Sequence, residues 1–139
     1  MKVYIAGKLC TKNERENLEK INELCERLGF KTFLPHRDVG LANNISNVEE
    51  IFEGDIKNGF KEVNLVVAML DGLQVGAGTA WELGYAYAKG IPAIGLKTDE
   101  SIEESLDNLS AILIGSMKIV NSFDELKNNL EKFKTNQEV

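Results

Sequence analysis

The stretch that decides the fold is residues 65–92, which read LVVAMLDGLQVGAGTAWELGYAYAKGIP. It begins with an unbroken apolar run, Leu65 to Leu70, which is typical of a parallel strand buried on both faces. A glycine-containing turn follows, and a mainly apolar segment then leads to Gly90 and Pro92. Glycine and proline are residues that end helices. The stretch therefore predicts a strand, a glycine turn and a helix over Thr79 to Lys89.

One carboxylate, Glu82, falls near the start of the predicted helix. In open α/β folds ligands bind at the carboxyl ends of the strands. The positive end of a helix dipole also favours an ionised carboxylate in the first helical turn. We therefore predict that Glu82 lies in a ligand crevice, is held ionised there, and acts as a nucleophile.

Strands and helices alternate on both sides of this stretch. Apolar runs predict further strands at residues 3–6, 30–34, 92–96 and 117–120. Capping-box spacing and helical periodicity predict helices that begin at Thr11, Ser46, Ile102 and Ser122. Such alternation predicts an α/β fold: a single-domain, doubly wound, flavodoxin-like or Rossmann-like sheet of five parallel strands with helices on both faces. The domain is expected over residues 1–133, with a disordered tail at 134–139.

Composition excludes several classes of protein. The chain has 139 residues and a formal charge of −6, without a cluster of Lys and Arg, which argues against binding nucleic acid. Cys10 and Cys25 form no CxxC pair, so they indicate reduced thiols and neither a zinc site nor a disulfide. No signal-like leader or apolar run of about 20 residues is present, so we expect a cytoplasmic protein that does not bind membranes.

Two further residues could act with Glu82. Asp55 falls on the apolar face of the helix predicted to begin at Ser46, and an inward-facing charge needs a partner or a function. Tyr4, in the first strand, could reach the same crevice. The residues alone leave other interpretations open, in which Asp55 caps a loop, Glu82 is solvated and Tyr4 packs in the core.

The predicted loops contain the candidate binding residues. Residues 35–47 lack periodicity and are expected to form a long loop near the crevice, in which His36 and Arg37 could contact a base or a phosphate. Lys8 has the same potential, although ordinary loop hydrogen bonds would also explain all three residues. Gly76 and Gly78 would let the backbone approach a ligand closely. Neither a dinucleotide fingerprint nor a P-loop is complete, and His36 is the only histidine, so we predict no cofactor and no metal.

Three segments in this order resemble the nucleoside 2-deoxyribosyltransferase family: VYIAG at 3–7, IFEGDI at 51–56 and GTAWELGYA at 78–86. The last segment is the most specific, and the related deoxynucleoside 5′-monophosphate N-glycosidases share the pattern. The resemblance implies that Glu82 attacks the anomeric carbon of a deoxyribosyl group. It also implies that Asp55 is the acidic partner that exchanges a proton with the base, and that Tyr4 orients the nucleophile.

The chain departs from the family pattern at Gly76. Transferases of the family usually carry an acidic residue six places before the nucleophile, and the monophosphate hydrolases tend to carry a serine. The base and the phosphorylation state of the substrate therefore stay open. The family also implies a homodimer or higher homo-oligomer whose neighbouring subunit completes the crevice, and Ser116 lies in the region expected to reach across. The predicted substrate-binding residues are Gly7, Lys8, His36, Arg37, Gly76, Gly78 and Ser116.

The resulting hypothesis is an enzyme of nucleotide metabolism and salvage that breaks the N-glycosidic bond of 2′-deoxynucleosides through a covalent deoxyribosyl-Glu82 intermediate. The sugar would pass to another base or to water. One alternative is a nucleoside 5′-monophosphate N-glycosidase, a hydrolase. A further alternative is a nucleotide-binding module without catalytic activity.

Overall fold

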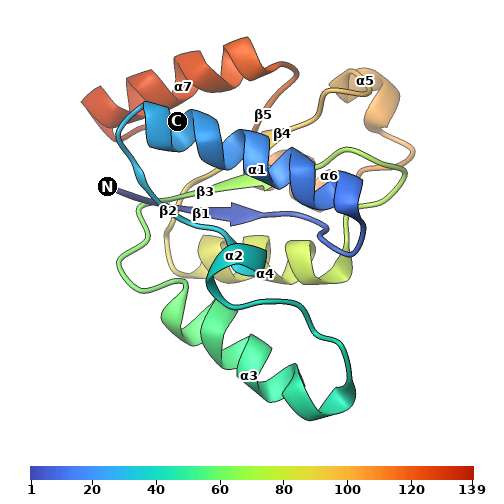
Figure 1. Cartoon of the computed structure of the whole chain (residues 1–139). Helices are drawn as coiled ribbons and strands as arrows, with labels where there is room; N and C mark the ends of the chain where they lie inside the picture. The colour runs from blue at the N-terminus through green and yellow to red at the C-terminus, as the bar shows by residue number, and fades with distance from the viewer.

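The structure is a computed structural model that describes residues 1–139. Five strands alternate with helices along the chain (Figure 1). The strands are β1 (Lys2–Ala6), β2 (Lys31–Phe33), β3 (Leu65–Met69), β4 (Ala93–Leu96) and β5 (Lys118–Val120). The helices are α1 (Lys12–Arg27), α2 (Pro35–Asp38), α3 (Val48–Phe52), α4 (Ala77–Ala88), α5 (Ile102–Ser105), α6 (Ala111–Ser116) and α7 (Phe123–Asn136), with a 3-10 turn η1 (Ile45–Asn47) and a π-helical turn η2 (Glu53–Asn58).

The sheet is entirely parallel, with the strand order β2-β1-β3-β4-β5. The chain moves outward in one direction through β1 and β2 and in the other through β3, β4 and β5. The order therefore reverses between β1 and β3, and in open α/β sheets ligands bind at the carboxyl side of such a reversal. The predicted five-stranded, doubly wound fold is confirmed.

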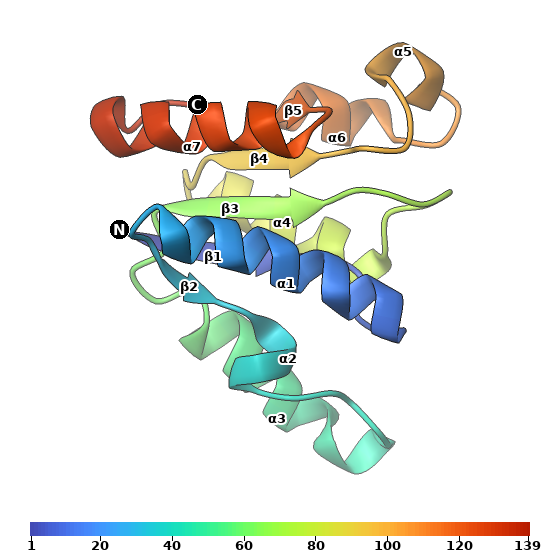
Figure 2. The same ribbon diagram turned by 45° about the horizontal axis from the view of Figure 1, so that its top comes forward.

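Helices cover both faces of the sheet, as Figures 1 and 2 show. Val3 and Ile5 of β1 pack in one core cluster with apolar residues of α1 and α7. Tyr4 and Ala6 point to the opposite face and pack in a second cluster with residues of η2 and α4. Alternate residues of a strand face opposite sides of the sheet. Tyr4 therefore points to the face that is covered by α4, the helix that contains Glu82, while Val3 and Ile5 point to the other face.

The two main capping predictions are confirmed. Thr11 and Glu14 form a reciprocal capping box at the start of α1, and the Ser122 side chain accepts a hydrogen bond from the Glu125 N–H at the start of α7. The capping expected from Ser46 is wrong. There the Asn44 side chain accepts from the Ser46 N–H and begins η1, because asparagine competes well for such a turn.

Other differences concern short elements. The expected loop at 35–47 contains α2 and η1, and the helix expected to begin at Ile102 is short, ending at Ser105. The short helix α6 was not predicted from its apolar run, and α7 continues through the first three residues of the segment 134–139. No helix has both the length and the apolar character that crossing a membrane requires.

Candidate active site

The largest apolar cleft lies where the chain order reverses, beyond the carboxyl ends of β1 and β3. Its volume is about 680 Å³. One wall follows β1, a second comes from α3 and η2, and the third is the turn into α4. It is lined by Gly7, Lys8, Leu9, Cys10, Pro35, Val48, Ile51, Phe52, Asp55, Ile56, Gly76, Ala77, Gly78, Thr79, Trp81 and Glu82.

Tyr4 and Glu82 meet beneath this cleft. The Tyr4 hydroxyl donates a hydrogen bond to Oε2 of Glu82, across 78 positions of sequence. Tyr4 is fully buried, and its pKa is raised by burial, by the charge of Glu82 and by that hydrogen bond. The phenol therefore stays protonated and serves as a fixed donor that orients the Glu82 carboxyl.

The expected electrostatics of Glu82 are wrong in one respect. α4 begins at Ala77, earlier than predicted, so Glu82 lies in the second turn and the first turn contains no acidic residue. The dipole acts mainly within the first turn. Burial instead raises the pKa of Glu82 to about 7; the Tyr4 hydrogen bond opposes this shift, and the nearby charge of Asp55 adds to it. Glu82 is thus a carboxyl group that is partly protonated near neutral pH.

Asp55 lies in the same cleft, on the π-helical turn η2. Its Oδ1 atom is buried without a hydrogen-bond partner in the chain, and burial raises its pKa to about 6. A buried carboxyl oxygen that lacks a donor favours a proton. The fold therefore brings together two carboxyl groups that can exchange protons near neutral pH.

The glycine turn forms the floor of the cleft beside Lys8. A Cβ atom at Gly76 would lie 2.9 Å from Cγ of Lys8, so the missing side chain makes room for the lysine stem. The Lys8 ammonium lies near Gly72, where a Cβ would be 3.1 Å from Nζ. Gly76 caps α4 without a side-chain hydrogen bond. Gly7, Lys8, Gly76 and Gly78 all line the cleft.

A buried lysine that we did not predict fixes the turn between β3 and α4. Lys97 is 2% exposed, and its ammonium lies 2.9 Å from Oδ1 of Asp99 and 3.3 Å from the carbonyl oxygens of Leu70 and Gly72. Asp99 also accepts a hydrogen bond from the Gly72 N–H at 2.9 Å. These contacts fasten the segment that leads to Gly76.

Three predicted binding residues do not line the cleft in this chain. His36 pairs with Glu19 of α1 at 3.2 Å, and Arg37 binds Glu26 and Asp38 at the surface. Their place in the helix α2, rather than in an open loop, turns them toward α1. The Ser116 hydroxyl donates to the Leu113 carbonyl at the end of α6. A contact from Ser116 to a neighbouring subunit stays a prediction.

An apolar part of the cleft lining was also missed. It consists of Val48, Ile51, Phe52 and Trp81. Trp81 is 51% exposed, with its ring stacked on Tyr85 at 5.6 Å and against the edge of Phe52 at 5.8 Å. The only sequence signal was a tryptophan directly before Glu82, which periodicity alone could not distinguish from a core residue.

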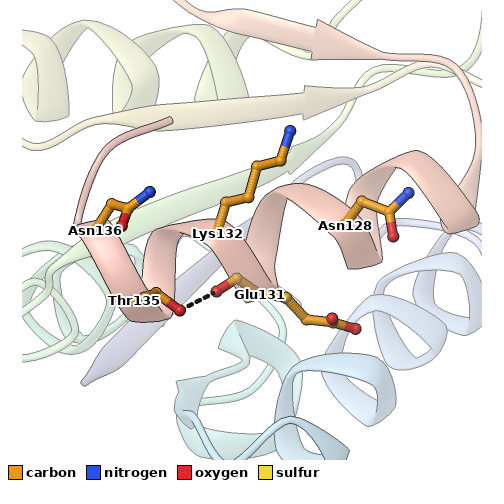
Figure 3. A pocket seen from close by; sticks show the side chains of 5 residues that line it. All are labelled: Asn128, Glu131, Lys132, Thr135 and Asn136. Atoms are coloured by element: carbon orange, nitrogen blue, oxygen red, sulfur yellow. Dashed lines mark hydrogen bonds between the residues drawn. The ribbon is translucent and has the colours of Figure 1, made fainter.

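A second hollow lies on the outer surface of α7, far from these groups in the fold. Figure 3 shows its polar side chains, Asn128, Glu131, Lys132, Thr135 and Asn136, on a single helix. The Thr135 hydroxyl donates to the Glu131 carbonyl oxygen at 3.2 Å, as helix-surface threonines commonly do. None of its lining residues is hydrophobic, so it lacks the apolar walls typical of a small-molecule site.

Known proteins share the fold of this chain. The structure is similar to that of a conserved protein from Enterococcus faecalis V583, with a TM-score of 0.76 and 24% identity over 95% of this chain and 98% of the other. It is also similar to a 2-deoxyribosyltransferase from Bacillus psychrosaccharolyticus, with a TM-score of 0.73 and 20% identity over 92% of this chain and 91% of the other. No match was found among curated proteins. The sequence model of the nucleoside 2-deoxyribosyltransferases matches residues 3–131, and the chain belongs to that family.

Proposed function

We propose that the protein cleaves the N-glycosidic bond of 2′-deoxynucleosides and passes the deoxyribosyl group to another base or to water. The observation that carries the proposal is the presence of Glu82 and Asp55 in one cleft at the point where the strand order reverses, with the buried Tyr4 hydroxyl bonded to Glu82. Retaining cleavage of a glycosidic bond needs one carboxylate as nucleophile and a second acidic group for the leaving group. The cleft contains one candidate for each role.

In the first step, an oxygen of ionised Glu82 forms a bond to the anomeric carbon while the bond from that carbon to the base nitrogen breaks. The electron pair of the broken bond goes to the base, and Asp55 donates its proton to that base. The products are a deoxyribosyl ester of Glu82, a neutral base and ionised Asp55.

In the second step, a different base or a water molecule attacks the anomeric carbon. Asp55 accepts the proton that this nucleophile releases, and the Glu82 carboxylate leaves. A base as acceptor gives a new deoxynucleoside, while water gives free deoxyribose. Both enzyme groups return to their starting states, so the cycle needs no cofactor.

The two carboxyl groups can hold one shared proton near neutral pH. Burial raises the pKa of Asp55 to about 6 and that of Glu82 to about 7, and the charge of Asp55 adds to the shift of Glu82. The two groups therefore titrate as a pair that holds one proton in this range. Because the pKa of Glu82 is the higher of the two, this proton lies mainly on Glu82 in the free protein. Catalysis requires its transfer to Asp55, which leaves the charge on Glu82, and the Tyr4 hydrogen bond stabilises that charge.

The polarity of the lining residues suggests where the base and the sugar of a nucleoside would lie in the cleft. The base would lie against Val48, Phe52 and Trp81, since aromatic rings stack well on the flat faces of bases. The sugar would lie over Glu82 and Asp55. Gly78, where no atom lies within 4 Å of an added Cβ, leaves the floor open for close approach of the ligand to the backbone.

Lys8 favours a second candidate function, the hydrolysis of nucleoside 5′-monophosphates. It is the one cationic side chain among the residues that line the cleft. It extends along the glycine turn toward Gly72, where it could pair with a phosphate on the 5′ oxygen. Arg37 cannot assist from its position, because its guanidinium is already bound to Glu26 and Asp38.

The test is chromatography of reactions with deoxyinosine or deoxyinosine monophosphate, each with and without free adenine. Glu82→Ala is the control for turnover, and Lys8→Met is the matched variant for the phosphate. Deoxyadenosine in the presence of adenine would support transfer. Hypoxanthine from the monophosphate alone, lost in Lys8→Met, would support the second candidate.

If no product forms from several purine and pyrimidine substrates, and Glu82→Ala still binds them as the wild type does, the proposed activity is wrong. The protein would then be a nucleotide-binding module without catalytic activity.

A further inference from the structure

The turn that carries Asp55 is not an α-helix. In η2 the Gly59 N–H donates to the carbonyl oxygen of Gly54, five residues back, at 2.8 Å. Such π turns are rare, and they occur frequently at functional sites. The irregular turn, rather than regular helical spacing, therefore determines where Asp55 lies in the cleft.

Gly59 is confined by two neighbours at once. A Cβ atom there would lie 2.3 Å from the carbonyl oxygen of Asp55 and 2.7 and 2.8 Å from two ring carbons of Phe33. Its φ of −61° is one that any residue adopts, so the constraint is space rather than conformation. The nearest atom belongs to the backbone of Asp55 itself, which cannot rotate away as a flexible side chain could.

The second neighbour, Phe33, belongs to an aromatic stack that holds Tyr4. The Tyr4 ring stacks on Phe33, at 5.1 Å between ring centroids, and on Phe60, at 4.0 Å. Phe60 follows Gly59 directly and also meets the edge of Tyr85 at 5.0 Å. The stack lies in the core cluster on the same face of the sheet as Ile56 of η2 and Leu83 of α4.

Gly59 therefore touches both halves of the candidate site, the backbone of Asp55 and the rings that hold the Tyr4 donor of Glu82. We propose that Gly59 is a positioning residue: the absence of a side chain lets the π turn close onto the Phe33–Tyr4–Phe60 stack, which sets the placement of Asp55 relative to Glu82. Its effect on turnover rests on the proposed function, while its effect on the placement of Asp55 does not.

The decisive variant is Gly59→Ala. The added methyl group must displace the Asp55 backbone, the Phe33 ring or both, so the placement of Asp55 relative to Glu82 changes. We expect kcat to fall by about tenfold or more, since small misplacements of reacting groups are costly, while KM changes little. The matched control is Gly84→Ala on α4, an exposed site with no atom within 4 Å of the added Cβ, which should behave as the wild type.

A second readout is independent of turnover. Carboxyl carbon NMR should show the titration of Asp55, near pH 6 in the wild type, moving in Gly59→Ala but not in Gly84→Ala. Wild-type kcat together with a wild-type Asp55 titration in folded Gly59→Ala would overturn the proposal. If the wild type itself lacks turnover, the proposed function fails, and the titrations still decide whether Gly59 positions Asp55.

Phe33→Leu provides a test if Gly59→Ala does not fold. It removes one of the two rings stacked on Tyr4, and with it the surface that Gly59 contacts. The titration of Asp55 should then shift, because the π turn loses part of the stack onto which it closes, and kcat should fall. Unchanged titration of Asp55 and unchanged kcat in folded Phe33→Leu would contradict the proposal.

Discussion

The ionised form of Glu82 destabilises the folded protein, because the fold buries its carboxyl group largely away from water. Its pKa is about 7 in the folded state, against an ordinary 4.5. The folded state therefore binds the proton more tightly, and stability declines as the pH rises from about 4.5 to about 7. Above that range the ionised group costs roughly 3 kcal/mol, as the shift implies.

Glu82→Gln should therefore abolish turnover and stabilise the protein at alkaline pH. Glutamine cannot ionise, and its carbonyl oxygen can still accept the Tyr4 hydrogen bond. In urea unfolding we expect a gain of up to roughly 3 kcal/mol at pH 8 and little difference at pH 4. An equal change at both pH values would show that burial of the charge is not the cause.

Tyr4→Phe tests the orienting hydrogen bond. Loss of one such bond should lower kcat/KM by about two- to tenfold. Because the bond opposes the raised pKa of Glu82, its loss should raise that pKa further and move the acidic limb of the pH profile to higher pH. Tyr87→Phe, on the exposed side of α4, is the matched control. An unchanged rate and pH profile in Tyr4→Phe would indicate a packing role alone.

The three polar residues of the site could be predicted because each lies in a short segment with its own pattern. Glu82 follows a strand and a glycine turn, Asp55 interrupts an apolar face, and Tyr4 lies in a strand. Lys97 could not be predicted, since its acceptors are Asp99 and carbonyl oxygens of a turn 25 to 27 positions earlier. The wrong expectation about the dipole at Glu82 came from a helix boundary only two residues in error.

At the level of elements, long periodic segments were predictable and short or irregular ones were not. α1 and α7 each present an apolar face and a polar cap, and both begin where the capping residues indicate. η2 has no such signal: its spacing of apolar residues also fits an α-helix. Gly59 at its end lies close to Phe33, which comes from another element and is not apparent in the local sequence.

Asp99→Ala tests whether the turn between β3 and α4 depends on Lys97. The buried ammonium would lose its carboxylate and keep only carbonyl acceptors, at a cost of about 1–3 kcal/mol in urea unfolding. Replacing both residues, as Lys97→Met with Asp99→Ala, should recover part of this loss, because the buried charge is then absent. Additive losses in the double variant would mean that the pair is not coupled.

At the level of the whole molecule, the order of elements determined what could be predicted about the site. A strand-helix alternation leads to a parallel sheet, and the reversal between β1 and β3 places the cleft. Tyr4, Asp55 and Glu82 come from three separate stretches of chain, so their meeting is a property of the topology. The way in which copies of the chain assemble is not contained in that topology.

Assembly into a homodimer is the prediction that belongs to this scale. Ile112 of α6 is 82% exposed, whereas Leu113 and Ile114 beside it pack against the core. A large exposed apolar side chain suits a contact between subunits. If α6 forms that contact, Ile112→Lys should shift sedimentation from dimer toward monomer. Turnover should fall as well, because Ser116 on the same helix would no longer reach the partner's cleft.

Ile45→Lys, at an equally exposed position on η1, is the control for added charge and should stay dimeric. Identical sedimentation of wild type and Ile112→Lys would exclude α6 as the interface.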